Sequence, residues 1–424
     1  MRPRSLSGVI MDSFRAMCKR VESVVRQAKG APAGRMELLE DAVSAALRDF
    51  GERLLQESVE RSLGRIGHGA CPCACGRSMH FVAQRRVRLV STQGEVTVRK
   101  TYFHCHHCGR TYAPEADAYG LDRGDYTERA RQEIVRQGTV GPSFAAASAE
   151  LKRRGIPASG ETVRKMTEST GHRVWRGQVS GDLESEPVAD LAGPVYVSCD
   201  AAKVNTLDGW KDVKLGEVYD RSRKVKRFVC HLGEPSALGR PLRRHAAALG
   251  LKETKEAVTI ADGAPWIWNL MEEHFPGALG IVDFFHVSEH LAECARQVFG
   301  EGTPKGRAWL EARNRQLKEQ GGEWVYGTLK VWTRRLPRRK RKAVQAVLDY
   351  MGPRLDKMRY PEFQRRGLDI GSGPIESACK NVIARRLKGP GMRWTIPNAN
   401  AMGELRGMLC SDRWHQVEQL VRAG

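Results

Sequence analysis

The sequence predicts a multidomain α/β protein, and three observations support this. The chain has 424 residues, enough for roughly two to four domains. From Val195 to about residue 298, strand-like and helix-like segments alternate. Between residues 67 and 115, cysteine and histidine gather in two clusters separated by β-rich sequence. The expected order is therefore a small cysteine-containing module followed by a larger α/β core.

The charge balance predicts a polyanionic partner. Lys and Arg number 70 against 49 Asp and Glu, which gives a formal net charge of +21. Nucleic acid is the commonest polyanion that proteins bind. The basic residues also cluster, at 334–342 and at 385–388. No apolar run reaches the roughly 18 residues of a membrane span, and the first residues lack the apolar core of a secretion signal. We therefore expect a soluble intracellular chain.

The first segment, residues 1–66, is predicted to be helical. Apolar residues recur at helical spacing in two stretches, and Gly30, Pro32 and Gly34 separate them. The pattern predicts two helices that pack on the body of the protein or on another copy of the chain.

Residues 67–120 are predicted to form a zinc-ribbon-like module. The first cluster offers Cys71, Cys73 and Cys75, and the second offers Cys105 and Cys108 as C-x-x-C. A glycine directly follows the last cysteine of each cluster. Eleven cysteines in an intracellular chain favour thiols or metal over disulfides. Four thiolates in a tetrahedron would hold a structural Zn²⁺ ion, and we select Cys73, Cys75, Cys105 and Cys108, with Cys71 in reserve. A redox pair is the alternative, and the neighbouring histidines are weaker substitutes as ligands.

Residues 121–185 are predicted to contain a helix-turn-helix. Ser143 caps an amphipathic helix that Gly155 ends, and Ser159 or Gly160 begins a second helix. A helix, a glycine turn and a capped helix are typical of DNA-reading modules, although many helical bundles contain such a pair. The exposed candidates on the second helix are Thr162, Arg164, Lys165 and Glu168, of which Arg164 and Lys165 are our DNA-binding candidates.

The α/β core is predicted over residues 190–298 and 371–400. Three strands (195–200, 213–219 and 226–232) are followed by a helix, a strand at 258–262, a helix and a strand at 280–284. This order is that of the ribonuclease H fold. In that fold the first and fourth strands end close together, so Asp200 and Asp262 could face one site. A carboxylate at the exit of a buried strand is costly unless it is paired or coordinated.

A third carboxylate, Glu376, lies in the sequence G-S-G-P-I-E-S-A-C-K that begins at Gly371. Pro374 suits the first turn of a helix, which places Glu376 near the helix start. It could satisfy free backbone amides there. Alternatively, it could complete a three-carboxylate cage for two catalytic Mg²⁺ (or Mn²⁺) ions. The residues alone leave both roles open.

Four motifs resemble those of Mutator-type DDE transposases of bacterial insertion sequences, particularly the ISKra group. They are A-D-G-A-P-W-I-W-N-L from Ala261, I-V-D-F-F-H-V-S-E-H-L from Ile281, G-S-G-P-I-E-S-A-C-K-N-V-I-A-R-R-L-K-G-P-G-M-R-W from Gly371, and Y-F-H-C-H-H-C-G-R from Tyr102. The resemblance covers most of the chain from about residue 70. It implies that Asp200, Asp262 and Glu376 are the catalytic residues and the Mg²⁺ ligands, in a bacterial, cytoplasmic and nucleoid-associated protein.

Family members also carry a motif of Cys or Asp, two residues and His, which Asp283 and His286 match. Their spacing puts them on one face of a helix. A buried salt bridge and a direct catalytic or DNA-positioning role both remain open, and we treat the two as supporting residues. Trp394 follows a flexible G-P-G and could contact an unpaired base.

The long separation of Asp262 from Glu376 predicts an insertion, which we place at residues 299–370 as a helical, basic module. Residues 401–424 are expected to be a C-terminal tail. Arg385, Arg386 and Lys388 are further DNA-binding candidates.

The resemblance implies a DNA transposase that binds the terminal inverted repeats of an insertion sequence, cleaves DNA with metal ions and transfers the strand. Its partners would be transposon-end and target double-stranded DNA, and a homodimer or larger assembly would hold two ends. The alternatives are a zinc-containing DNA-binding protein with an inactive ribonuclease H-like domain, or a structure-specific nuclease of the same fold.

Overall fold

A computed structural model describes residues 6–30, 34–62, 66–120, 124–189, 191, 193–251 and 256–423. The chain divides into two compact units, one of residues 1–167 with 418–424 and the other of residues 168–417. The boundary falls inside a helix, before the polar connector at 180–187. None of the described helices is long and apolar enough to cross a membrane.

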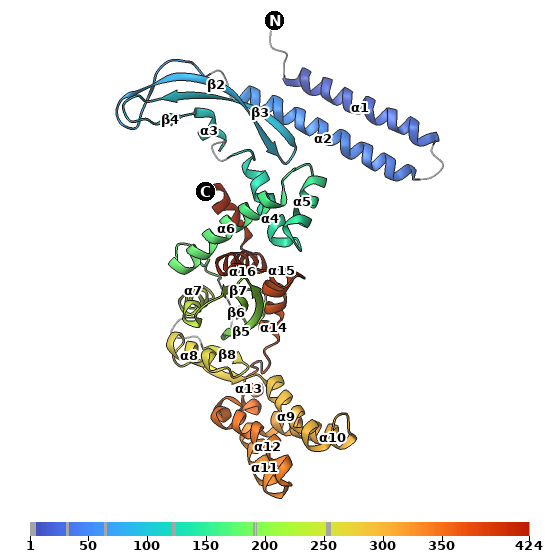
Figure 1. Cartoon of the computed structure of the whole chain (residues 1–424), viewed down its shortest axis with the longest axis vertical. Helices are drawn as coiled ribbons and strands as arrows, with labels where there is room; N and C mark the ends of the chain where they lie inside the picture. Colours follow the sequence, from blue (N-terminus) through green and yellow to red (C-terminus); the bar gives the residue numbers. More distant parts are fainter. Residues whose placement is uncertain are drawn as a thin grey trace. The chain divides into compact units, whose positions relative to one another are not determined.

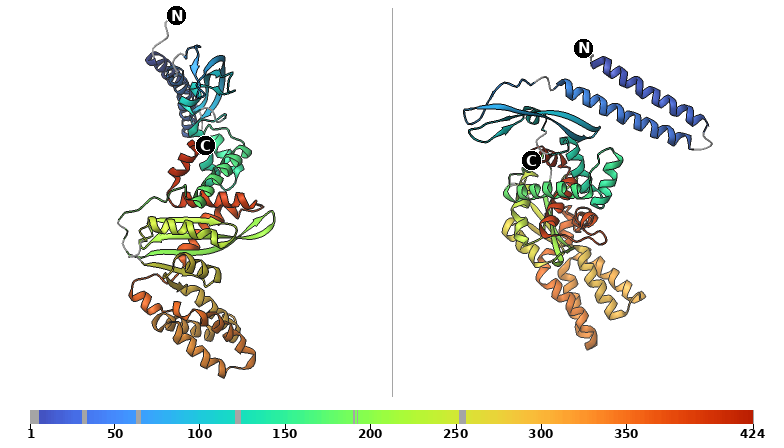
Figure 2. Two further views of the ribbon diagram at one scale, coloured as in Figure 1. Left: turned by 90° about the vertical axis from the view of Figure 1, so that its left-hand side faces the viewer. Right: turned by 45° about the horizontal axis from the view of Figure 1, so that its top comes forward.

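The first unit begins with a hairpin of two long helices, α1 (Leu6–Gly30) and α2 (Arg35–Ser62), which lie side by side (Figures 1 and 2). The predicted break between the two helices is confirmed, although Pro32 itself lies outside the described residues. The rings of Phe14 and Phe50 are 6.3 Å apart, so the start of α1 lies beside the middle of α2.

A four-stranded antiparallel sheet follows in the order β1-β2-β3-β4. The long strands β2 and β3 form a hairpin around Gly94, within the β-rich sequence between the two cysteine clusters. Leu89, Val96 and Val98 form a small core on one side, where α3 packs. The elements are β1 (Cys71–Pro72), β2 (Ser78–Ser91), β3 (Gly94–His104), β4 (Thr111–Tyr112) and α3 (Pro114–Tyr119).

Three helices complete the first unit: α4 (Glu128–Val140), α5 (Phe144–Arg153) and the first part of α6 (Gly160–Ser180). The predicted caps are confirmed. The Ser143 side chain accepts a hydrogen bond from the amide of Ala146, and the Ser159 hydroxyl accepts one from the amide of Thr162. Gly155 has a φ of +81°, the left-handed conformation that glycine tolerates best.

The second unit is built on a five-stranded mixed sheet in the order β7-β6-β5-β8-β9. Strands β5, β6 and β7 pair antiparallel, whereas β8 pairs parallel to both β5 and β9. Helices α7 (Gly239–Ala248) and α8 (Pro265–His274) belong to a core that includes Val197 and Ala261. The strands are β5 (Val195–Thr206), β6 (Gly209–Asp220), β7 (Lys226–His231), β8 (Ala257–Ala261) and β9 (Leu279–Val282).

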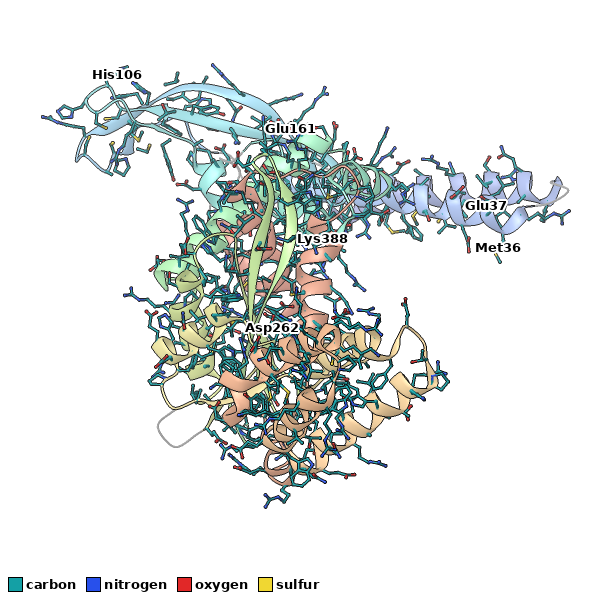
Figure 3. The ribbon with its side chains drawn as sticks, turned by 60° about the horizontal axis from the view of Figure 1, so that its bottom comes forward. Met36, Glu37, His106, Glu161, Asp262 and Lys388 are labelled. Atoms are coloured by element: carbon teal, nitrogen blue, oxygen red, sulfur yellow. The ribbon has the colours of Figure 1, made fainter. Side chains whose placement is uncertain are left out.

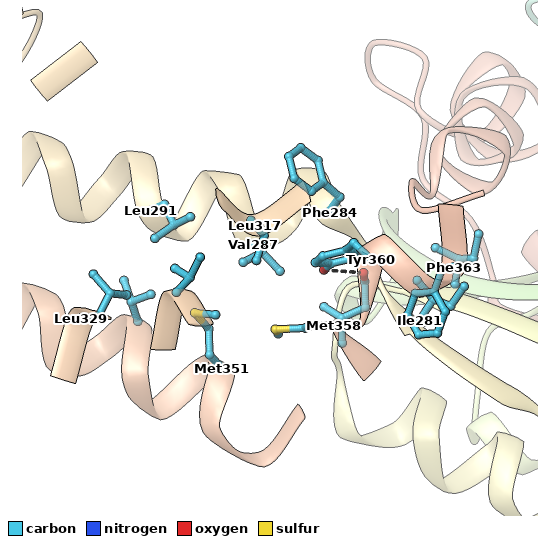
Figure 4. Close-up of a cluster of buried hydrophobic side chains, with 14 of the residues drawn as sticks. Ile281, Phe284, Val287, Leu291, Leu317, Leu329, Met351, Met358, Tyr360 and Phe363 are labelled. Atoms are coloured by element: carbon cyan, nitrogen blue, oxygen red, sulfur yellow. Dashed lines mark hydrogen bonds between the residues drawn. The ribbon is translucent and has the colours of Figure 1, made fainter. Parts of the chain in front are cut away.

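The insertion predicted at 299–370 is helical, and it shares one core with the sheet. This core joins Ile260 and Ile281 to Leu291, Leu317 and Leu329, as Figure 4 shows in part. In the same figure, the Tyr360 hydroxyl donates a hydrogen bond of 2.8 Å to the carbonyl of Val282. The helices here are α9 (Phe284–Phe299), α10 (Pro304–Gln320), α11 (Gly322–Arg335), α12 (Arg338–Met351), the 3₁₀ helix η2 (Gly352–Lys357) and α13 (Tyr360–Arg365).

The segment expected as a tail is instead largely helical. After α14 (Gly373–Ala378), the π-helix η3 (Cys379–Ala384) and α15 (Arg385–Leu387), helix α16 (Ile396–Cys410) packs on β7, and α17 (Trp414–Ala423) follows. Asn400 and Glu404 on α16 accept hydrogen bonds from the amides of Leu232 and Cys230. These side chains cover a sheet edge that would otherwise expose backbone amides, so the tail prediction is wrong.

Candidate functional site

Two matching turns present the cysteines of the first unit. In the first, the amide of Cys73 bonds to the carbonyl of Arg77 and the amide of Gly76 to the carbonyl of Cys73. The second turn repeats this pattern, with the amide of Cys105 bonded to Arg110 and the amide of Gly109 to Cys105. Both glycines have positive φ, +80° and +73°, which explains why glycine follows each cysteine cluster.

The four cysteines selected from the sequence lie together. The Sγ atoms of Cys73, Cys75, Cys105 and Cys108 are all within 4.8 Å of one another. The Cys73–Cys108 and Cys75–Cys105 sulfur pairs are 3.5 and 3.6 Å apart. Zn–S bonds of about 2.3 Å imply S···S edges of about 3.8 Å in a tetrahedron. The thiol set therefore fits one tetrahedral metal such as zinc, and Cys71 is not part of it.

The thiols do not ionise alike. Backbone amides, that of Cys108 foremost, lower the pKa of Cys105 to about 6 by stabilising its thiolate. For Cys75 the amide of Arg77 acts in the same direction, but burial and the three neighbouring thiols outweigh it and raise the pKa to about 12. Cys105 is thus preformed as a thiolate, whereas Cys75 needs a nearby cation to ionise. The nearby His106 extends outward from the module in Figure 3.

The basic face of this module is partly neutralised by α2. Arg86, Arg88 and Arg99 line a groove of about 1250 Å³ together with acidic side chains. The acidic residues are Glu52, Glu57, Glu60, Glu95 and Glu115. Any phosphate contact by these three arginines therefore competes with carboxylates of the same unit.

In the second unit, strand register aligns three aspartates. Val195 and Tyr196 on β5 pair with Ala257 and Val258 on β8, and the same offset carried onward places Asp200 level with Asp262. Ala261 pairs with Val282, and the amide of Asp283 bonds to the Ala261 carbonyl at 2.8 Å, so Asp283 is level with Asp262.

Side-chain alternation puts two of these carboxylates on one face of the sheet. Asp200 follows Tyr196 by four residues, and Asp262 follows Ile260 by two. Tyr196 and Ile260 belong to the same buried cluster. The two carboxylates therefore point to the side of the sheet that α9 and the insertion cover.

Asp200 is half-buried, and its surroundings fit a group that needs a cation. Burial raises the pKa of Asp200 and the nearby charge of Asp262 raises it further, whereas the Ala201 amide, the Cys379 thiol and the charge of His286 lower it. The Cys379 Sγ lies 3.5 Å from Asp200 Oδ2. A carboxylate whose pKa is raised by burial and by a neighbouring carboxylate is stabilised when a divalent cation lies beside it.

The turn after Asp262 is held from the insertion. Asp262 Oδ1 accepts a hydrogen bond from the Ala264 amide at 2.8 Å. The hydroxyl of Tyr350 donates to the Asp262 carbonyl at 2.6 Å, and the guanidinium of Arg354 donates to the carbonyl of Gly263. The ring of His290 stacks on Tyr350 with centroids 3.8 Å apart. Tyr350 and Arg354 carry no signal in the sequence, because no local motif marks contacts that span 88 and 91 residues.

Glu376 lies on the helix that faces Asp200. Helix α14 packs against β5 and β6, and Glu376 is exposed in its first turn. Its Oε1 lies 3.3 Å from the hydroxyl oxygen of Ser372. One turn later, Cys379 contacts Asp200 and begins the π-helix, a distortion that is frequent at functional sites.

The three predicted catalytic carboxylates share this region without forming a compact cage. In the described parts of the chain, the cysteine cluster is the one group of three or more thiol, imidazole or carboxylate ligand atoms within 4.8 Å. Strand register thus aligns Asp200 with Asp262, and Glu376 lies on the helix packed against β5, but the three carboxylates are not closed around a single point.

Asp283 does not pair with His286. It is fully buried and caps α9, and its carboxylate accepts hydrogen bonds from the amide of Phe285 and the hydroxyl of Ser372. His286 Nδ1 instead lies 3.8 Å from Glu289. The prediction of a buried salt bridge between Asp283 and His286 is thus wrong. Asp283 instead contacts Ser372, which also holds Glu376.

A further carboxylate, Glu217, was missed by sequence reasoning. Glu217 on β6 pairs with Ser198 on β5, and Ser198 lies two residues before Asp200. The side chain of Glu217 is fully buried. Neither oxygen has a hydrogen-bond partner within the described structure, and Lys226 Nζ is 3.8 Å away. Burial raises the pKa of Glu217 to about 7, against the charges of Lys226 and Arg223.

The predicted DNA-binding residues divide into exposed and buried ones. Arg164 and Lys165 both pair with Glu161 on the surface of α6. Arg385 and Lys388 are exposed. Arg386 is not available to a ligand, because it is 1% exposed and lies over the ring of Trp394. Trp394 is also buried and donates a hydrogen bond to the Leu387 carbonyl. The side chains of Arg386 and Trp394 are therefore not open to DNA, contrary to the prediction.

Comparison with known proteins adds little. No family model matches the chain, and no curated protein matches it. Among solved structures, the chain is similar to the Drosophila P element transposase strand transfer complex, with 11% identity and a TM-score of 0.29. This likeness covers 71% of this chain and 82% of that one. A match at that level does not establish a common fold.

Proposed function

We propose that the chain is a DNA transposase of the Mutator-like DDE type, with a ribonuclease H-like core. The observation that carries the proposal is the alignment of Asp200 with Asp262 on one sheet face, with the helix of Glu376 packed against β5. The strand order β7-β6-β5-β8-β9, with three antiparallel strands and two parallel ones, supports the fold.

Asp200, Asp262 and Glu376 would hold Mg²⁺ ions, which would activate a water molecule and neutralise charge on the scissile phosphodiester. The chain's own residues prepare this site. Tyr350 and Arg354 fix the turn at Asp262, and the Ser372 hydroxyl donates to Asp283 and lies beside Glu376. These contacts restrict the carboxylates before DNA arrives, which reduces the ordering cost of the reaction.

The net charge of +21 and the exposed basic residues support DNA as the substrate. Arg385 and Lys388 follow the helix of Glu376 and would contact DNA phosphates close to the reacting strand. The cysteine module and the α5–α6 pair would bind the terminal inverted repeats, with Zn²⁺ as a structural ion.

The test is a cleavage and strand-transfer assay on double-stranded DNA that carries the sequences flanking the gene, with Mg²⁺. We expect Asp262→Asn to reduce both products by at least ~10³-fold, about 4 kcal/mol of transition-state stabilisation, without loss of DNA binding. The matched control is Asp212→Asn, because Asp212 is exposed on β6 and pairs with Lys203.

Unchanged strand transfer by Asp262→Asn would end the catalytic proposal. Metal-dependent hydrolysis without strand transfer would favour a nuclease. DNA binding with neither product would favour a binding protein whose core is inactive.

A further inference from the structure

The helical hairpin at the start of the chain exposes most of its surface. Among the described side chains of α1 and α2, only Ala28 and Ala46 are fully buried. Large apolar side chains are open to solvent, with Met36 70% exposed, Leu47 54% and Met11 49%. Figure 3 shows Met36 at the start of α2, at the end of the hairpin where the two helices are connected. A helix gains most of its stability from packing an apolar face, so this hairpin lacks part of its expected contact.

Helix α1 has two apolar rows instead of one. The first row faces α2 and follows the alternating spacing of four and three residues that is typical of coiled coils. It contains Ile10, Phe14, Met17, Val21, Val24 and Ala28. The second row contains Met11, Cys18 and Val25, which are seven residues apart. Each of them directly follows a residue of the first row. On the other side of the first row, the equivalent positions are polar: Ser13, Arg20 and Gln27.

Helix α2 repeats this arrangement. Its inner row passes through Leu39, Ala42 and Ala46, and a second row contains Met36 and Val43, seven residues apart, with Leu47 one turn after Val43. Phe50, the next position of this row, packs against Phe14 of α1. In an antiparallel pair, the positions that follow the inner row on each helix lie on the same side of the pair. The two second rows therefore form one surface, the outer apolar face.

The charges of the two helices are opposite. Helix α1 carries five basic and two acidic side chains, whereas α2 carries four basic and seven acidic ones. A second hairpin turned so that its α1 lies on α2 of the first places unlike charges beside each other at both contacts. The outer apolar face is thus complementary to itself under a two-fold rotation.

We infer that the outer apolar face binds the same face of a second copy, forming an antiparallel four-helix bundle between two chains. Helices of about 40 Å packed roughly 10 Å apart offer about 800 Å² per copy, which is the size of a standard stable interface. This surface does not depend on the proposed catalytic activity.

The test is the mass of the full chain measured by light scattering during size exclusion, without DNA and across a dilution series. We expect twice the chain mass of 47.3 kDa for the wild type. The double variant Val43→Lys with Leu47→Lys should run as a single chain, with a dimer Kd raised at least about 100-fold, because it places two positive charges against the basic α1 of the partner.

The matched control is Leu38→Lys, since Leu38 is 45% exposed on the same helix but precedes the inner row and lies on the other side. It should remain dimeric. Bound zinc and tryptophan fluorescence, measured on every variant, show that both units stay folded. A wild type that is monomeric at all concentrations overturns the inference, as does a double variant with wild-type mass. A double variant that melts earlier at unchanged mass also overturns it, because the face would then pack within one chain.

Discussion

The cysteine cluster and the aspartate-bearing sheet edge bring their side chains together in different ways. The four sulfurs lie within 4.8 Å of one another, and two short turns built from neighbouring residues set their positions. Strand register aligns Asp200 with Asp262, and Glu376 comes from a distant helix, but these carboxylates are not gathered around one point. A structural ion needs a closed set of ligands, whereas a catalytic site keeps room for a substrate.

This contrast also explains which contacts are local. Each cysteine turn is closed by backbone hydrogen bonds between residues four or five apart, such as Cys105 and Arg110. The turn at Asp262 depends on Tyr350 and Arg354 from the insertion. The cysteine module should therefore respond to loss of its own ligands alone, and the sheet edge should respond to changes in the insertion.

The largest expected effect is on the cysteine module. Cys105→Ser removes one of four thiols, and we expect bound zinc to fall from one ion per chain to nearly none. The binding energy lost is on the order of 10 kcal/mol, because metal binding and folding are coupled in such modules. Elemental analysis of the purified chain and circular dichroism of the β-hairpin measure the effect. Cys71→Ser is the control and should keep its zinc; full retention by Cys105→Ser would remove Cys105 from the ligand set.

The features predicted best from the sequence are those set by residues close together in the chain, such as helix caps and tight turns. Ser143, Gly155 and the Cys-Gly turns are set by local capping and backbone preferences, and all are where the pattern places them. The paired strands followed from apolar alternation and turn signals. In the candidate site, the pattern placed Asp200 and Asp262 on neighbouring strands. It ended the first strand at Asp200, whereas β5 continues to Thr206, and it did not give the contacts between segments.

The errors have a common physical cause, which is packing between distant segments. Arg386 belongs to a basic cluster in the sequence, yet the fold buries it beside Trp394. The part of the segment 401–424 that belongs to α16 has little amphipathic pattern, because this helix is buried on nearly all sides. Helix α17 is amphipathic, so its sequence alone could have predicted it. Glu217 reads as an ordinary polar residue in a strand, although it is fully buried.

The second prediction tests whether the buried carboxyl group of Glu217 lowers the stability of the second unit at neutral pH. The folded pKa of Glu217, about 7, is above its ordinary value of 4.5 because burial disfavours the charge. Its contribution to stability is therefore fully present below about pH 4.5 and is lost as the pH rises to about 7. The loss is about 3 kcal/mol. Glu217→Gln should remove this loss, so the variant should be more stable than the wild type at pH 8 but not at pH 4.5.

Denaturant unfolding followed by tryptophan fluorescence measures this change, because all nine tryptophans lie in residues 168–417. The fluorescence then reports the second unit without interference from the cysteine module. Glu234→Gln, at an exposed position, is the control. Equal stability differences at both pH values would show that Glu217 is not a buried acid that titrates in the folded state.

The smallest expected effect separates holding the site from folding it. Tyr350→Phe removes the hydroxyl that donates to the Asp262 carbonyl at 2.6 Å and leaves the stacked ring beside His290. We expect a loss of about 1 kcal/mol and a DNA cleavage rate reduced by roughly tenfold or less, with DNA affinity unchanged. Tyr326→Phe, on α11 beside Gly352, is the matched control. If cleavage by Tyr350→Phe equals that of the wild type while the thermal midpoint still falls, the insertion supports the fold of the sheet edge but does not position Asp262 for the reaction.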